Sequence, residues 1–332
     1  MIFIQKMKFK NKKFFKKTTV LVLFIIFIIM NTSRIQLKKL INNNVNNVRI
    51  CICTIGKEEN RYIREFVYHY KKYGIDKIFL YDNNDIDNER FEDVLSDFND
   101  NKFVEILNYR GIYLAQFSAY EDCYLKNNKT YNWLIFYDID EFINLKNYTN
   151  VKQFLSEKKF NECPAVYLNC LRHTDNNLLY YDNRTLAERF PIIKWKSQLY
   201  TVKSILKGNI SEVHFKTCHW IDRAITGCNS LGEKIAPNKR KHLFSDINNY
   251  KDCYIDHYCF KSTEEYINKI RKGDAVFGID LKNILHKINS YFTYNEISYI
   301  KIRYIESKLG IDLKEYRMEL KKKKAKNNDN LI

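Results

Sequence analysis

The stretch WLIFYDIDEFINL, residues 133–145, sets an apolar run directly before a group of acids. Its first five residues are aromatic or aliphatic, as in a strand that is buried on both faces. Asp138, Asp140 and Glu141 follow within four residues. Carboxylates this close raise each other's pKa and need a cation or solvent to coexist. The stretch therefore predicts a buried strand that delivers acids to its carboxyl end, where open α/β sheets bind ligands.

Strands and helices alternate around this stretch. Strand patterns cover residues 48–55, 76–85, 103–109 and 133–143, and helix patterns cover residues 59–74 and 115–127. The first helix pattern repeats apolar residues at spacings of three and four and ends at Gly74. This alternation predicts an α/β fold with a mostly parallel sheet flanked by helices.

The second half of the chain is less regular. Strand-like runs occur at residues 164–173, 203–208 and 211–220, and a helix is expected to begin at Ser262 or Thr263. A chain of 332 residues has room for one large domain or two modest ones. One domain with an irregular second half fits this pattern better than two independent domains.

The net charge of +17 is concentrated at the two ends of the chain. Seven lysines precede the first apolar run, and five more lie between residues 321 and 326. Without these twelve lysines the body carries only +5. A nucleic-acid-binding surface would place its positive charge on the folded body, so no nucleic-acid partner is predicted.

An uncharged apolar run, residues 18–30, follows the N-terminal lysines. Extended to Ser33, it approaches the roughly 20 residues of a spanning helix. A cleaved signal peptide has a similar layout, but no clear small-residue cleavage site follows. The predicted organisation is a cytoplasmic basic tail at 1–17, a membrane anchor at 18–33, a stem at 34–47, a catalytic domain at 48–310 and a basic tail at 311–332. Positive charge stays in the cytosol, so the body would face the Golgi or endoplasmic reticulum lumen in a eukaryote, or be held outside the inner membrane in a bacterium.

Nine cysteines contain no CxxC pair, so no zinc framework is predicted. Cys51 and Cys53 lie two apart on a predicted strand and are expected to be buried. Beyond a membrane, disulfides would form among the later cysteines, whose pairing stays open: Cys163, Cys170, Cys218, Cys228, Cys253 and Cys259. Sequons begin at Asn128, Asn147, Asn183 and Asn209.

Asp138 and Asp140 form an Asp-x-Asp motif at the end of the predicted strand. Their oxygens suit Mn²⁺ or Mg²⁺, and a diphosphate would complete the shell, as in nucleotide-sugar transferases. Phosphatases of the haloacid dehalogenase type carry the same motif, but continue with Thr or Val where this chain has Glu141 and Phe142. The alternative to both is a solvated loop.

The chain resembles the GT-A glycosyltransferases of family 92 and a related family-2-like group. The resemblance rests on GKEENRYIREFVYHYKKYGIDKIFLYDNNDID at residues 56–87, on Gln116 and Cys123, on residues 133–143, on KSIL and VHF at 203–206 and 213–215, and on DHYCFKSTEEYINKIRKG at 256–273. His214 follows KSIL by the spacing of the family. Glu58 departs from the pattern, which usually has Asn there, and residues 146–200 match poorly. The resemblance implies a GT-A (Rossmann-like) fold and a metal-dependent, inverting hexosyltransferase that moves a sugar from a nucleotide donor to a hydroxyl of a glycan or glycoconjugate.

Candidate site residues follow from the motifs and the resemblance. Nucleotide-sugar contacts are expected from Thr54, Lys57, Glu59, Asp82, Gln116, Asp138, His257 and Lys261. The metal ligands are expected to be Asp138, Asp140 and a late histidine: His214 is the first choice and His257 the second, and His219 is a further candidate. The general base would be one of Asp175, Glu188 and Asp222. Each of these residues also has an ordinary alternative, as a helix cap, a turn residue or a buried hydrogen-bonding group.

Two rival functions stay open at this point. A phosphatase would use Asp138 as its nucleophile and release phosphate without any nucleotide. A non-catalytic lumenal sugar-binding protein would bind sugar or nucleotide without turnover.

Overall fold

The computed structural model describes residue 30 and residues 47–99, 102–194, 201–211, 213–215, 226–235, 250–273 and 280–329. One compact unit spans Arg49–Ile332. The predicted tail and anchor, and nearly all of the predicted stem, lie outside the described residues. Within the described part of the chain, no helix combines the length and the apolar character needed to cross a bilayer.

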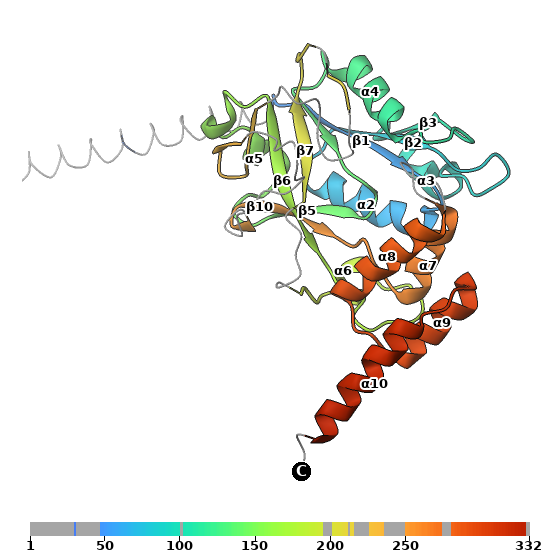
Figure 1. Cartoon of the computed structure of the whole chain (residues 1–332). Helices are drawn as coiled ribbons and strands as arrows, with labels where there is room; N and C mark the ends of the chain where they lie inside the picture. The colour runs from blue at the N-terminus through green and yellow to red at the C-terminus, as the bar shows by residue number, and fades with distance from the viewer. Residues whose placement is uncertain are drawn as a thin grey trace, which may run out of the picture. The chain divides into compact units, whose positions relative to one another are not determined.

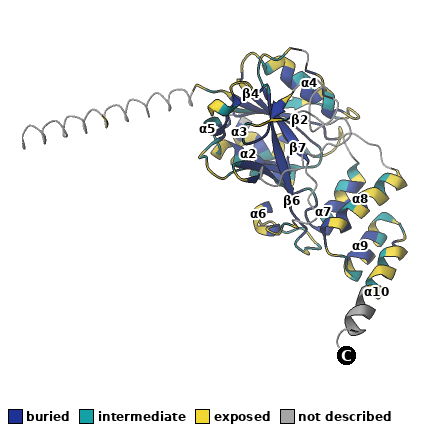
Figure 2. Cartoon of the chain, turned by 60° about the vertical axis from the view of Figure 1, so that its left-hand side comes forward, coloured by how far each residue is buried: buried dark blue, intermediate teal, exposed yellow. Residues whose placement is uncertain are grey.

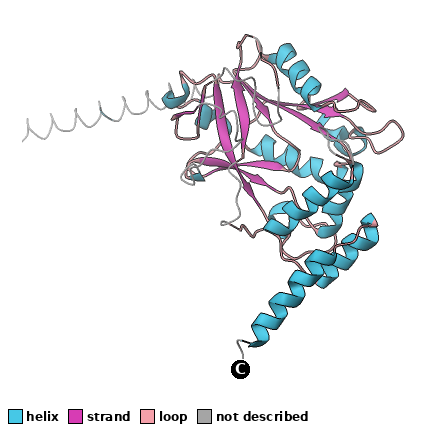
Figure 3. Cartoon of the chain, viewed as in Figure 1, coloured by secondary structure: helices cyan, strands magenta, loops and turns pink. Residues whose placement is uncertain are grey.

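Strands and helices of the unit are shown in Figure 1 and coloured by type in Figure 3. The strands are β1 Ile50–Gly56, β2 Lys77–Asp82, β3 Val104–Asn108, β4 Trp133–Phe136, β5 Glu141–Leu145, β6 Ala165–Arg172, β7 Val202–Lys207, β8 Gly227–Cys228, β9 Lys234–Ile235 and β10 Cys253–His257. The helices are α2 Asn60–Lys72, α3 Glu92–Asn99, α4 Gln116–Asn127, α5 Val151–Leu155, α6 Leu186–Arg189, α7 Thr263–Lys272, α8 Leu281–Tyr294, α9 Tyr299–Leu309 and α10 Lys314–Asp329, with one 3₁₀ turn at Lys158–Phe160.

The main sheet has the strand order β3-β2-β1-β4-β7-β6-β10-β5. Its first four strands are parallel, as the sequence predicts. The other half is mixed, because β7 runs antiparallel to β4 and β6, and β5 runs antiparallel to β10. The prediction of a mostly parallel sheet therefore holds only for the first half.

The predicted strand at residues 133–143 is divided in two. β4 ends at Phe136 and β5 begins at Glu141, whose backbone N–H donates to the carbonyl of Asp138 at 3.0 Å. This turn lets β4 pair with β1 while β5 pairs with β10. Asp138 and Asp140 thus lie in a short connection between two differently oriented parts of the sheet.

Helix α2 packs against this connection. It buries one apolar face, made of Tyr62, Ile63, Phe66, Val67 and Tyr70, as its spacing predicts. The hydroxyl of Tyr70 donates to the Glu141 carbonyl at 2.8 Å and accepts from the Ile143 N–H at 3.1 Å. The helix ends at Lys72, and Gly74 adopts a φ of 79°, a conformation that glycine reaches without strain.

Helix α4 covers one face of the parallel half of the sheet. Because side chains alternate along a strand, Cys51, Cys53 and Ile55 of β1 all point into the same apolar cluster as Ala119 and Tyr120 of α4. Figure 2 shows the central strands as mainly buried. The Asp-x-Asp connection therefore follows directly from a strand in the interior of the protein.

Two disulfides connect parts of the fold. Cys53 of β1 is joined to Cys123 of α4, and Cys163 is joined to Cys228 of β8. Cys163 and Cys228 are among the cysteines that were predicted to form disulfides, whereas the Cys53–Cys123 disulfide was not predicted. Among the described cysteines, Cys51, Cys170, Cys253 and Cys259 are free thiols.

The C-terminal helices share a second apolar cluster. Helix α7 begins at the N-cap Ser262, whose side chain forms a capping box with Glu265, in agreement with the predicted start. Its Tyr266 stacks on Tyr291 of α8, with ring centroids 4.7 Å apart. Much of the predicted basic tail is helix α10, and Leu313, just before it, is buried in the same cluster.

Candidate functional site

Asp138 is held by three side chains from the interior of the fold. Its Oδ1 accepts hydrogen bonds from Gln116 Nε2 at 3.0 Å and Tyr120 OH at 3.1 Å, both on α4. Its Oδ2 lies 2.7 Å from Nζ of Lys203 on β7. Burial acts to raise the pKa of Asp138, but Lys203 and His257 together oppose it and leave the pKa below its ordinary value. Asp138 is therefore an ionised group with a fixed orientation.

Asp140 lies between His257 at the end of β10 and Lys269 on α7. Its Oδ1 is 3.5 Å from His257 Nε2, and its Oδ2 is 2.9 Å from Lys269 Nζ. Burial opposes ionisation, but Lys269 and His257 hold the pKa of Asp140 well below its ordinary value. Burial also lowers the pKa of His257, against the pull of Asp140, which favours the neutral imidazole that binds metals.

Glu141, the residue after Asp140, is fully buried. Burial raises its pKa to about 8, against the opposing charge of Lys203 at 3.3 Å. One of its oxygens, Oε2, accepts from the Asp138 N–H at 3.0 Å. The other, Oε1, has no hydrogen-bond partner and lies 3.8 Å from Nδ1 of His257, which also has none.

This group of side chains fits a divalent cation. The carboxylates of Asp138 and Asp140 and the imidazole of His257 are the oxygen and nitrogen ligands that Mn²⁺ accepts. Nε2 is the nitrogen of His257 that faces Asp140, whereas Nδ1 faces Glu141. Potential ligand atoms of Glu141, Cys170 and His257 also lie within 4.8 Å of one another. Burial raises the pKa of the Cys170 thiol well above its ordinary value, so Cys170 stays protonated and is a poor ligand.

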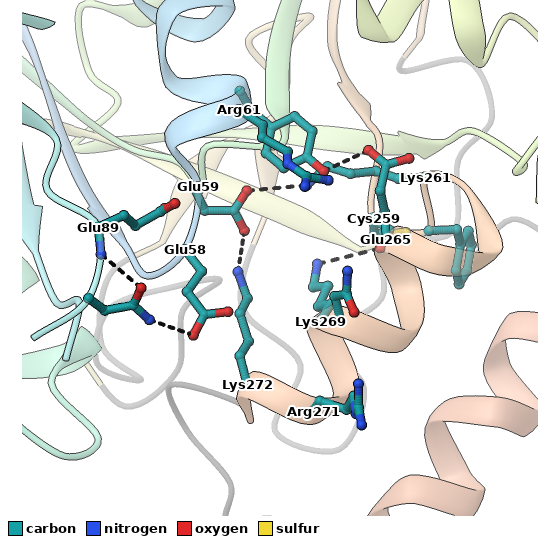
Figure 4. Close-up of a pocket in the computed structure, with 14 residues that line it drawn as sticks. Glu58, Glu59, Arg61, Glu89, Cys259, Lys261, Glu265, Lys269, Arg271 and Lys272 are labelled. Carbon is teal, nitrogen blue, oxygen red and sulfur yellow. Dashed lines mark hydrogen bonds and ion pairs between the residues drawn. The ribbon is translucent and has the colours of Figure 1, made fainter. Parts of the chain in front are cut away.

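A cavity of about 500 Å³ is lined in part by Lys269, whose ammonium contacts Asp140. Its walls come from the start of α2, the loop after β2, the segment after β10, and α7. Charged residues of both signs line it: Arg61, Lys261, Lys269, Arg271, Lys272, Glu58, Glu59, Glu89 and Glu265. Figure 4 shows Glu58 and Glu59 facing Lys269 and Lys272 across this space.

Glu59 links the two walls of the cavity. Its carboxylate lies 2.6 Å from Lys272 Nζ and 3.3 Å from Lys261 Nζ. Burial opposes the charge of Glu59, but Lys261 and Lys272 lower its pKa below the ordinary value. Lys261 has a φ of 54°, a left-handed conformation uncommon for residues other than glycine, and its Nζ lies 3.8 Å from the centre of the Tyr62 ring. Strain of this kind clusters at functional sites.

Of the eight predicted donor-binding residues, only Glu59 and Lys261 line the cavity. Gln116, Asp138 and His257 belong to the acidic group described above, and the other three lie elsewhere. Thr54 is buried in β1, and its hydroxyl has no hydrogen-bond partner. Lys57 pairs with Asp85 at 2.8 Å. Asp82 is buried at the end of β2 and pairs with Arg110 at 2.9 Å. The lysine and the aspartate thus brace the loop after β2, which supplies Asn88 and Glu89 to the cavity.

The predicted bases do not line the cavity in the described part of the chain. Asp175 is buried, with Oδ2 2.6 Å from Lys301 Nζ, and it accepts a hydrogen bond from Tyr291. Glu188 completes a capping box with Thr185 at the start of α6. The third candidate, Asp222, lies outside the described residues.

The structure places the candidate histidines differently, and the third of them, His219, lies outside the described residues. His214 is largely exposed, and its nearest acidic partner is Glu121, with 3.7 Å between Nδ1 and Oε1. His257 is the histidine that contacts Asp140, because antiparallel pairing of β10 with β5 places it opposite Glu141. Sequence reasoning also left Lys203 without a role, although a lysine inside an apolar strand pattern signals a buried counter-ion.

Comparisons of this sequence with a family model and with curated relatives point to the same protein family. The model of glycosyltransferase family 92 matches residues 46–264. A family 92 glycosyltransferase of Oryza sativa subsp. japonica is 28% identical over 95 residues, which cover 28% of this chain and 16% of the relative. One from Arabidopsis thaliana is 30% identical over 94 residues, covering 28% and 16%. The aligned segments thus span less than a fifth of these relatives.

Among solved structures, similarity is low. The structure of GalNAc-T7 with UDP, GalNAc and Mn²⁺ gives a TM-score of 0.29 at 15% identity, covering 39% of this chain and 24% of that one. Residues 1–349 of TarS from S. aureus give a TM-score of 0.33 at 11% identity, covering 74% and 70%. Scores this low carry no argument about the site. The family match, in contrast, runs from before β1 to the start of α7 and includes Asp138, Asp140 and His257, so the chain belongs to glycosyltransferase family 92.

Proposed function

We propose that the protein is a metal-dependent hexosyltransferase of GT-A type, which transfers a sugar from a nucleotide donor to a hydroxyl of a glycan or glycoconjugate. The observation that carries this proposal is the contact of Asp140 with both His257 and Lys269. Through Lys269, this contact connects the candidate metal ligands to a charged cavity of about 500 Å³, a volume suited to a small ligand.

Asp138, Asp140 and His257 would hold Mn²⁺ or Mg²⁺ in this site. The bound cation supplies Lewis-acid stabilisation of the departing nucleoside diphosphate. Gln116 and Tyr120 orient Asp138 through its Oδ1. Lys203 pairs with Asp138 and also contacts Glu141. These contacts fix the ligand before the donor arrives, which is the preorganisation that catalytic sites need.

The donor would occupy the cavity, with its diphosphate towards Lys269. In the transfer step, the acceptor oxygen forms a bond to the anomeric carbon as the bond from that carbon to the phosphate oxygen breaks. The hydroxyl proton passes to a carboxylate base, and the electron pair leaves with the nucleoside diphosphate. Direct displacement of this kind inverts the anomeric configuration.

The two disulfides support a location beyond a membrane. Disulfides persist in oxidising compartments and are rare in the cytosol, and Cys53–Cys123 and Cys163–Cys228 both lie in the folded unit. With the basic, then apolar, N-terminal sequence, they favour a single-pass protein whose body faces the lumen of the secretory pathway, or the outer side of a bacterial inner membrane.

A screen of nucleotide sugars tests the proposal. Purified protein is incubated with UDP-, GDP- and CMP-linked sugars and Mn²⁺, and released nucleotide is measured with and without EDTA. We expect release from one donor class, lost on chelation. Release of phosphate from simple phosphate esters, without any nucleotide sugar, would instead support the phosphatase. Binding of a nucleotide without turnover, with and without glycan acceptors, would support the sugar-binding protein.

A further inference from the structure

Lys269 contacts the candidate metal ligand Asp140 and also lines the cavity. Its Nζ lies 2.9 Å from Oδ2 of Asp140, while its side chain lines the cavity and is 39% exposed. Figure 4 shows this side chain extending from α7 into the same space as Lys272. A side chain in this position has access to the metal-binding carboxylate and to the cavity.

A cation on Asp140 and the ammonium of Lys269 compete for the same carboxylate. Their like charges also repel at short range, more strongly in a partly buried site than in water. Lys203 pairs with Asp138 and Lys269 pairs with Asp140. The side chain of Lys203 is fully buried and also contacts Glu141, so it stays in place. Lys269 stands at the cavity on a flexible four-carbon stem, so metal binding would displace Lys269.

The acids that line the cavity already have partners, so a bound anion would be a new partner for the displaced ammonium. Glu265 pairs with Arg189, Glu89 accepts a hydrogen bond from the Asn60 N–H, and Glu58 accepts one from Asn88. Lys261 and Lys272 line the same cavity, and both are already paired with Glu59. A diphosphate next to the metal would bring several oxygens to the wall where Lys269 stands. Charge-assisted hydrogen bonds to phosphate are stronger than neutral ones.

Resting on the function proposed above, we propose that Lys269 is a donor-binding residue that exchanges partners: it neutralises Asp140 before the metal binds and contacts the diphosphate of the donor afterwards. The lysine therefore opposes metal binding to the donor-free protein and favours binding of the nucleoside diphosphate. These two effects have opposite signs, which a purely structural ion pair does not produce.

The test measures the two binding steps separately in Lys269→Gln. Mn²⁺ binding to the donor-free protein is followed by electron paramagnetic resonance. Binding of UDP, GDP and CDP at saturating Mg²⁺ is followed by calorimetry, with the nucleotide that binds the wild type most tightly used for all variants. We expect Lys269→Gln to bind Mn²⁺ at least about threefold more tightly and the nucleotide about tenfold more weakly.

Lys272→Gln is the matched control, because it removes the same charge from the same helix but contacts Glu59 instead of Asp140. It should show no gain in Mn²⁺ affinity. Lys269→Arg keeps the charge and should retain nucleotide affinity within a few-fold, and thermal melting of each variant checks that it is folded.

The outcomes separate the two proposals. Wild type that binds Mn²⁺ and a nucleotide, with Lys269→Gln unchanged in nucleotide affinity or weaker in Mn²⁺ affinity, overturns the exchange and leaves the proposed function standing. Wild type that binds neither Mn²⁺ nor any of the nucleotides overturns both.

Discussion

The ammonium of Lys203 lies 2.7 Å from Oδ2 of Asp138, and the lysine side chain is fully buried. Lys203 stands on β7 in the middle of the sheet, and Asp138 follows the neighbouring strand β4. The same ammonium is 3.3 Å from Glu141. The chain thus provides one internal positive charge for two of the three acids that follow β4.

Removing this charge should destabilise the fold. Breaking a buried ion pair by deleting one partner leaves an uncompensated charge and costs about 3–5 kcal/mol. Because the Asp138 side chain is one-third exposed and water offsets part of the loss, we expect Lys203→Met to lower the free energy of unfolding in urea by about 3 kcal/mol, the lower end of this range. Lys126→Met is the control, since its surface pair with Asp122 is worth about 0.3–0.5 kcal/mol. Equal stability of the two variants would show that Asp138 and Glu141 do not depend on Lys203.

His69 should make the stability of the protein depend on pH. Its Nε2 is 3.0 Å from the carbonyl of Ile143, and burial lowers its pKa to about 4. The unfolded chain binds a proton near pH 6.5 and the folded chain does not. This contribution to stability is complete above pH 6.5 and falls as the pH drops towards 4.

The variant His69→Gln keeps a hydrogen-bond donor and removes the titrating group. Between pH 7 and pH 5, the wild type should lose about 2 kcal/mol more unfolding free energy than this variant, because each tenfold difference in proton affinity between the folded and unfolded chain is worth about 1.36 kcal/mol. His286→Gln, at an exposed position of α8, serves as the control and should follow the wild type. Identical pH profiles for wild type and His69→Gln would contradict the burial argument.

The two disulfides should have similar effects on stability but different effects on the site. They span 70 and 65 residues, so chain entropy predicts about 4 kcal/mol of stabilisation from each. Only the Cys53–Cys123 bond anchors α4, the helix that carries Gln116 and Tyr120.

Replacing either pair by alanines should therefore lower the urea midpoint to a similar extent. Loss of Cys53–Cys123 should in addition raise the Mn²⁺ concentration for half-maximal binding several-fold, whereas loss of Cys163–Cys228 should not. Mn²⁺ binding equal to that of the wild type in both double variants would show that α4 holds Gln116 and Tyr120 without the disulfide.

The parts of the fold that depend on local sequence are the ones that the sequence predicted. The buried strand at Trp133–Phe136, the apolar face of α2 and the Ser262 cap each depend on residues within one or two turns of chain. Contacts between distant segments were not predictable in the same way. His257 reaches Asp140 because β10 returns to pair with β5, more than a hundred residues earlier in the chain. Periodicity contains no information on that register, so the spacing after Lys203 pointed to His214 instead.

The histidines can be distinguished by metal dependence. We expect His257→Ala to raise the Mn²⁺ concentration needed for half-maximal donor turnover by about tenfold or more, because losing one ligand costs about 1.4 kcal/mol or more. His214→Ala, at its exposed position beside Glu121, should match the wild type. A shift confined to the His214 variant would restore the assignment made from sequence.

Anomalous diffraction from crystals soaked with Mn²⁺ and the preferred nucleoside diphosphate tests the central claim most directly. The account predicts one strong anomalous peak, about 2.0–2.6 Å from a carboxylate oxygen of Asp140, with a ring nitrogen of His257 in the same shell and the diphosphate in the cavity beside Lys269. A strongest peak at His214, or nucleotide bound in the cavity with no metal at Asp140, would contradict it.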